Sequence, residues 1–117
     1  MNPDTKAFLA ALDDLERALD ANEELTARMR QRMAAIRAGC ASGRPLSEVI
    51  AVEKPPLIVQ LLSESAALVQ ATGARVRRTE AHALYREGLT MDRIARLFGV
   101  TRQRVSALLR EPAPPPE

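Results

Sequence analysis

The stretch GLTMDRIARLFGVTRQRVSALLR, residues 88–110, decides the fold of this chain. It holds two short segments with helical apolar periodicity, separated by Gly99, Val100 and Thr101. Glycine leaves a helix in the left-handed conformation at no steric cost, and threonine is a good cap for the helix that follows. Thr90 is the expected cap of the first segment. The spacing therefore predicts two short helices joined by a tight turn.

The apolar positions of this stretch predict a small shared core. Ala95 has a small side chain where the second helix must cross closely over the first, and Val100 is expected to plug the corner. The other core positions are Ile94, Phe98, Val105 and Leu108. This pattern is typical of a helix-turn-helix, whose second helix enters the major groove of DNA. An ordinary helical hairpin with the same corner is the alternative.

Residues 90–105, TMDRIARLFGVTRQRV, resemble the C-terminal promoter-reading domain of bacterial sigma factors, which carry Thr-Leu-x-x-Ile-Ala/Gly and then Val-Thr-Arg-Glu-Arg-Ile/Val. They are also similar to the DNA-binding domains of resolvase-class recombinases. The resemblance covers about the last third of the chain and implies a tri-helical DNA-binding domain. Gln103, Ser106 and Ala107 depart from the sigma pattern, so the sigma sequence preference is not implied. Nothing in the sequence resembles a sigma core or a recombinase catalytic domain.

Helical phase divides the second helix into two faces. Val105 and Leu108 face the core, which leaves an opposite face expected to read bases through Arg102, Gln103, Ser106 and Arg110. Arginine reads guanine and glutamine reads adenine, each pair being worth about 1–3 kcal/mol of discrimination. Phosphate contacts are expected from Arg93, Thr101 and Arg104. A further group either reaches the DNA or forms a solvated helix face: Arg75, Arg77 and Arg78.

Charge is unevenly distributed along the chain. Residues 74–110 carry nine arginines against three acidic residues, a net charge of +6. Because the whole chain carries +2, the remainder carries −4. A basic module on an acidic remainder favours a polyanionic partner, here double-stranded DNA. A solvated arginine-rich surface is the alternative.

Residues 4–38 predict one long helix that begins after Asn2-Pro3 and stops at Gly39. Steps of four and three residues form a heptad stripe with a polar centre: Phe8, Leu12, Leu15, Leu19, Asn22, Thr26, Met29, Met33 and Ile36. Residues 1–25 carry two basic and seven acidic side chains, net −5, whereas residues 26–44 carry five basic side chains and no acid, net +5. An antiparallel self-pair aligns acid with base, whereas a parallel pair aligns like charges.

A homodimer with antiparallel first helices is therefore expected. Leu12 would face Ile36 of the partner subunit, Leu15 its Met33, Leu19 its Met29, and Asn22 its Thr26 at the centre. The alternative is that this helix packs only within its own chain, against residues 57–69.

The complete chain is predicted to be all-α, with residues 1–73 as a helical oligomerisation region, 74–111 as the helix-turn-helix domain and 112–117 as a disordered proline-rich tail. Residues 39–45 are expected to form a linker and 46–53 a short helix. Residues 57–72 are apolar on most faces, which is typical of a buried helix. Gly73 either ends that helix or lies within a longer one, and Gly88 is the expected cap of residues 74–87.

Other classes of function have little support in the sequence. Cys40 and His82 lie in no metal or catalytic pattern, and no P-loop or dinucleotide motif occurs, so neither an enzyme nor a cofactor or metal site is expected. No apolar run reaches membrane-spanning length, and no signal peptide is expected. The sequence favours a cytoplasmic, nucleoid-located transcriptional regulator. A nucleoid-associated architectural protein and an adaptor that binds RNA polymerase are the alternatives.

Overall fold

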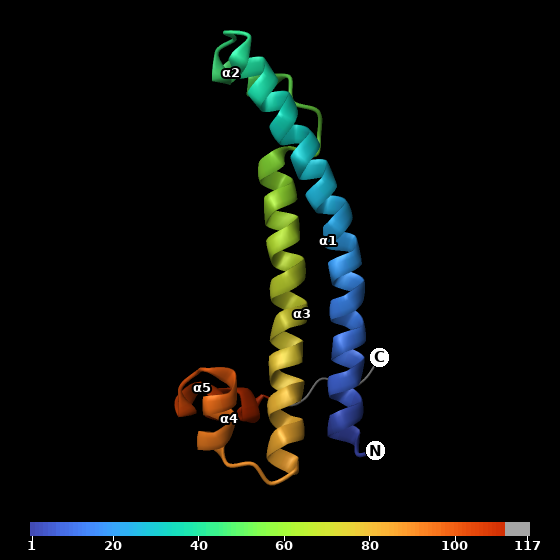
Figure 1. Ribbon diagram of the computed structural model, residues 1–117, viewed down its shortest axis with the longest axis vertical. Coiled ribbons are helices and arrows are strands. Elements are labelled where there is room, and N and C mark those ends of the chain that lie inside the picture. Colours follow the sequence, from blue (N-terminus) through green and yellow to red (C-terminus); the bar gives the residue numbers. More distant parts are fainter. Residues whose placement is uncertain (112–117) are drawn as a thin grey trace. The chain divides into compact units, whose positions relative to one another are not determined.

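The structure, a computed structural model, describes residues 1–111 and is all-helical over them (Figure 1). The helices are α1 Pro3–Ala41, α2 Leu46–Ala51, α3 Ile58–Arg86, α4 Met91–Phe98 and α5 Arg102–Arg110. The predicted all-α class and long N-terminal helix are confirmed. The tail expected at residues 112–117 lies outside the described residues.

Helix α1 begins as its sequence predicts and ends later. The Asn2 Oδ1 accepts a hydrogen bond from the Thr5 backbone N–H at 2.9 Å, and Pro3 occupies the first helical position. These residues satisfy or remove the backbone donors that a helix start leaves unpaired. The predicted stop at Gly39 is wrong, because α1 continues to Ala41.

Gly39 serves packing rather than termination. A Cβ atom built on it would lie 2.9 Å from Cγ2 of Val49, which is a buried residue of α2. The absence of a side chain at Gly39 thus lets α2 approach α1 closely. The chain reverses after Ala41 instead, where Gly43 adopts φ +85°, a conformation that favours glycine.

Helix α3 is continuous through Gly73, the second of the two arrangements that the sequence left open. Its first turn is capped by side chains, since the Gln60 Oε1 accepts from the Leu57 N–H and the Glu53 Oε1 accepts from the Ile58 N–H, both at 2.7 Å. Gly88, at φ +101°, follows its C-terminal end, and the predicted capping role of this glycine is confirmed.

The chain divides into two compact units, to which α1 and α3 both contribute. The terminal unit combines residues 1–17 with the described residues from 70 onward. Here the first turns of α1 pair with the end of α3 through the ion pairs Asp14–Arg75 and Asp4–Arg86, the latter at 3.5 Å. Buried Ala7 and Ala11 allow close packing of α1.

The hairpin unit spans Ala18–Val69. In it α1 and α3 run antiparallel, because Asn22 hydrogen-bonds to Ser65 while the Arg32 Nε–H donates to the Pro56 carbonyl at 3.2 Å. The buried contacts of this unit include Ala18, Leu25 and Leu61.

The expectation that residues 57–72 form a buried helix is wrong within this chain. Leu61 is the fully buried residue of that stretch, whereas Val59 and Leu62 are exposed. The physical reason lies in the hairpin unit, where α1 packs against one side of α3 and leaves the apolar residues of another side exposed.

Candidate nucleic-acid interface

The turn between α4 and α5 has the capped geometry that the sequence predicts. The Thr90 Oγ1 accepts from the Arg93 N–H at 3.2 Å, and the Thr101 Oγ1 accepts from the Arg104 N–H at 3.1 Å. Between the two helices Gly99 adopts φ +68°, and the Val100 N–H donates to the carbonyl of Ala95 at 3.0 Å. Backbone groups at both helix ends are therefore satisfied locally, which holds α5 at a defined angle to α4.

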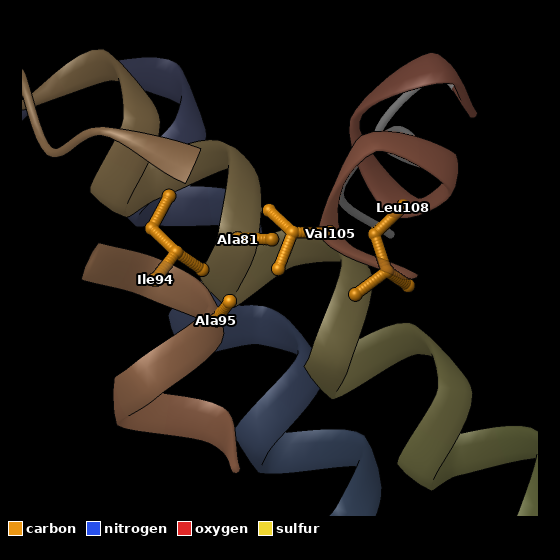
Figure 2. Packing of buried hydrophobic residues seen from close by; sticks show 5 residues of the cluster. All are labelled: Ala81, Ile94, Ala95, Val105 and Leu108. Atoms are coloured by element: carbon orange, nitrogen blue, oxygen red, sulfur yellow. The ribbon is translucent and has the colours of Figure 1, made fainter. Parts of the chain in front are cut away.

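Beneath this turn lies a cluster of buried apolar side chains (Figure 2). Its members are Ala81 of α3, Ile94 and Ala95 of α4, and Val105 and Leu108 of α5. Phe98 packs against the cluster and is partly buried. The predicted core is thus present, and α3 contributes to it through Ala81.

Val100 does not plug the corner, and that prediction is wrong. Its side chain is 39 % exposed and lines a cavity on the surface. Residues of α3, α4 and α5 close the core without it, because Ala81 brings α3 directly against Ile94 and Val105.

The residues predicted to touch DNA are mostly exposed. Exposed side chains belong to Arg93, Thr101, Arg102, Gln103, Arg104 and Arg110. Ser106, the remaining predicted base-reading residue, is half-buried, since it follows the buried Val105 directly. The hydroxyl oxygen of Thr101 caps α5, and its hydrogen is still free to donate to a phosphate.

An ion pair that the sequence analysis did not predict joins the two helices. The Arg102 Nε lies 3.7 Å from Oδ1 of Asp92, and both side chains are largely exposed. Asp92 also lies in the first turn of α4, where a negative charge is favourable. No sequence spacing indicates this contact, because it depends on the angle between α4 and α5.

Two of the three arginines at the start of the basic region have acidic partners in the terminal unit. Arg75 pairs with Asp14 and is largely buried, and Arg78 pairs with Glu111 at 3.4 Å. Arg77 is exposed. The solvated-face alternative therefore does not describe Arg75, whose guanidinium stabilises the contact between α1 and α3.

A cavity of about 310 Å³ lies beside α4 and α5 and is lined partly by Arg77, Glu80, Leu97 and Arg104. Partial burial raises the pKa of the Glu80 carboxyl above its usual value, since burial disfavours the ionised form. The cavity thus combines an apolar wall with a carboxyl group and two guanidinium groups. Sequence reasoning missed it, because its lining comes from three helices.

The predicted dimer stripe is only partly covered within the chain. In the terminal unit Leu12 is exposed and Leu15 is half-buried. In the hairpin unit Leu19 and Met33 are exposed, and the half-buried members are Asn22, Thr26, Met29 and Ile36. Asn22 uses its side-chain oxygen on Ser65 of the same chain. The intrachain seam of α1 uses mainly the neighbouring alanines instead.

A histidine and a cysteine are the remaining candidate groups in the described part of the chain. The Nε2 of His82 lies 2.6 Å from the carbonyl oxygen of Glu111, and Cys40 is exposed. Among residues 1–111, no group of three or more His, Cys, Asp or Glu side chains is arranged to hold a metal ion. Over the same residues, no helix has both the length and the apolar character that crossing a membrane requires.

Comparison with models of protein families, with curated proteins and with solved structures gives no match. The resemblance of residues 90–105 to sigma-factor and resolvase DNA-binding domains therefore rests on the motif alone.

Proposed function

We propose that this protein is a sequence-specific regulator of transcription that binds double-stranded DNA as a homodimer. The observation that carries the proposal is the α4–α5 pair, whose capped turn and shared core leave the cations of α5 exposed. A helix held in this way can enter the major groove with its first residues against the base edges. The net charge of +6 on residues 74–110 supports a polyanionic partner.

Within this proposal, the first residues of α5 recognise the DNA base sequence. Arg102 and Gln103 are exposed there and suit guanine and adenine respectively. Arg93 and Arg104 bind phosphates and set the position of the helix without specifying bases. Arg110, at the other end of α5, reaches the far side of the site.

The homodimer follows from the small size of the DNA-binding element. One helix-turn-helix covers about half of an operator, and such proteins usually pair to bind two half-sites. Exposed Leu12, Leu19 and Met33 on α1 support self-association, because apolar side chains of this size gain from leaving water.

The test begins with selection of binding sites from a pool of random duplexes. We expect one enriched motif with two related half-sites. Binding titrations on that motif should then show that Arg102→Ala weakens binding by about 1–3 kcal/mol and flattens preference at one base pair.

Arg104→Ala is the matched control for base reading. It should weaken binding to all sequences alike and reduce the slope of log affinity against log salt by about one unit. Unchanged affinity and unchanged base preference after Arg102→Ala would show that α5 does not read DNA bases through Arg102. If selection yields no motif, and genome-wide binding maps show broad coverage, the architectural alternative would be favoured.

A second candidate function has one observation in its favour. Leu97 is 63 % exposed and lines the same surface cavity as Val100. Such a pair suits contact with a protein, as in an adaptor that binds RNA polymerase. This function would be favoured if the unmodified protein binds purified RNA polymerase but not DNA. The Leu97→Ser variant should then lose its binding to the polymerase.

A further inference from the structure

The hairpin unit exposes two apolar stripes, one on each of its long helices. On α1 the exposed side chains include Leu19, at 48 %, and Met33. On α3 they include Val59, at 61 %, and Leu62, at 55 %. Several large apolar side chains exposed on one unit commonly mark a site of association.

Both stripes lie on the same side of the hairpin. On α1 the exposed Leu19 directly follows the buried Ala18, and on α3 the exposed Leu62 directly follows the buried Leu61. One residue turns a helix by about 100°. The two helices face each other and run in opposite directions. A rotation of about 100° from the buried contact, in the chain direction of each helix, therefore reaches the same side of the hairpin on both helices.

We propose that this side is the homodimer interface, and that a second copy of the chain packs on it to form a four-helix bundle. We call it the two-helix face and define it by Leu19, Thr26, Met33, Val59, Leu62, Ala66 and Val69. The inference rests on the homodimer proposed above and adds α3 to an interface that the sequence assigned to α1. It does not depend on DNA binding.

Charge selects a second copy as the occupant and sets its direction. Along the part of α1 that lies in the hairpin unit, the net charge is −3 over residues 18–25 and +4 over residues 26–41. A second α1 running antiparallel therefore places acidic side chains opposite basic ones. Complementary charge of this kind favours one orientation over its reverse.

A two-fold axis lying in the two-helix face pairs each of the two helices with its own copy in antiparallel orientation.

The α3 stripe Val59, Leu62, Ala66 and Val69 has its own midpoint at residue 64. An antiparallel α3 pair thus brings Val59 to Val69 of the second copy and Leu62 to its Ala66. A symmetric dimer requires all contacts to share one two-fold axis. Antiparallel helix pairs of this form pack as a four-helix bundle.

The test compares glutamate substitutions at exposed apolar positions of the full chain. Val59→Glu and Leu62→Glu should each convert the dimer to a monomer at micromolar concentration, as measured by sedimentation velocity. An unpaired carboxylate in a desolvated interface is strongly disfavoured. Val52→Glu is the matched control, because Val52 is 63 % exposed in the same unit but outside the two-helix face. Circular dichroism verifies that each variant keeps its helices, and Leu62→Gln replaces Leu62→Glu if the latter does not fold.

Crosslinking tests the register. In a Cys40→Ser background, a chain with Leu62→Cys should crosslink to a chain with Ala66→Cys more efficiently than two Leu62→Cys chains crosslink to each other. A dimer that survives Val59→Glu and Leu62→Glu but not Leu19→Glu would overturn the inference and keep the homodimer on α1 alone. A monomeric unmodified chain would overturn both. The Arg102→Ala test of DNA binding is independent of both results.

Discussion

At the scale of single residues, Asp92 is the ion-pair partner of Arg102, the proposed base-reading residue. Its carboxylate lies 3.7 Å from the Arg102 guanidinium, on the exposed side of the α4–α5 pair. An exposed ion pair of this type contributes little to stability, in the range of about 0–1 kcal/mol. We expect its effect to be on orientation instead, because the ion pair restricts the rotamers of Arg102.

Asp92→Asn is expected to separate affinity from specificity. Loss of a negative charge near the DNA should tighten binding to all sequences, while the freed Arg102 should discriminate less at its base pair. Titrations against the selected site and a single-base variant measure both effects. The control is Glu87→Gln, which removes another exposed negative charge and leaves Asp92 in place. Discrimination that stays intact in Asp92→Asn would show that the ion pair does not orient Arg102.

Glu80 makes the stability of the folded protein depend on pH. Burial raises the pKa of its carboxyl in the folded state, so ionisation costs more in the folded than in the unfolded protein. Stability is therefore reduced by this group as pH rises through the raised pKa, and the reduction is absent where both states are protonated. Arg77 and Arg104 line the same cavity as Glu80.

Glu80→Gln should accordingly unfold at a higher temperature than the unmodified chain at neutral pH. The gain should shrink as pH falls from neutral to the ordinary pKa of a glutamate, because the carboxyl is then increasingly protonated in both states. Thermal unfolding followed by circular dichroism at about pH 7 and about pH 4 measures this difference. Exposed Glu87→Gln is the control and should show no such gain. An equal effect of Glu80→Gln at both pH values would attribute it to packing.

At the scale of elements, two glycines differ in their place in a helix, one at a C-terminal end and one in the interior. Gly99 has φ +68° at the C-terminal end of α4, with open space around its missing side chain. Gly73 lies inside α3, and a Cβ there would meet Arg77 Nη1 at 3.4 Å. The first position thus needs a left-handed backbone, whereas the second only weakens a helix.

Gly99→Ala is expected to destabilise the protein by about 1–2 kcal/mol, the strain of a left-handed residue with a side chain. Gly73→Ala is expected to stabilise it by about 0.5–1 kcal/mol, because alanine favours the helix interior and the flexible Arg77 side chain can move. Urea denaturation of the two variants measures both changes. Destabilisation by Gly73→Ala would indicate close packing at that position.

At the scale of the whole molecule, association should control DNA affinity. Leu19→Glu places a carboxylate in the proposed interface and should yield a monomer that keeps its helices. Affinity for a site with two half-sites should then fall by about 10²-fold or more, since the second half-site no longer binds at high effective concentration. Sedimentation and DNA titration of the same sample test this coupling.

The control for this coupling is Leu9→Glu, an exposed position of α1 that lies outside the stripe. It should remain dimeric and bind DNA normally. A monomeric Leu19→Glu with undiminished DNA affinity would show that one helix-turn-helix suffices for binding.

Features that depend on neighbouring residues could be predicted from the sequence. Asn2 at the start of α1, Thr90 and Thr101 as helix caps, and Gly99 as a left-handed terminator are all confirmed. Each of them acts through hydrogen bonds or backbone angles within about five residues, so the local sequence contains the whole interaction. The all-α class follows from the same local preferences and from apolar periodicity.

Features that depend on contacts between distant segments were decided only by the tertiary structure. The sequence marked Gly39 as a helix end, but α2 packs Val49 against it and α1 continues. The sequence also did not indicate the Asp92–Arg102 pair, the cavity beside Glu80 or the burial of Arg75 against Asp14. Periodicity shows that α1 carries apolar and small side chains on adjoining faces, but only packing decides which face meets α3. Ala7, Ala11 and Ala18 are buried because small side chains permit close helix contact, and Leu12 and Leu19 stay exposed.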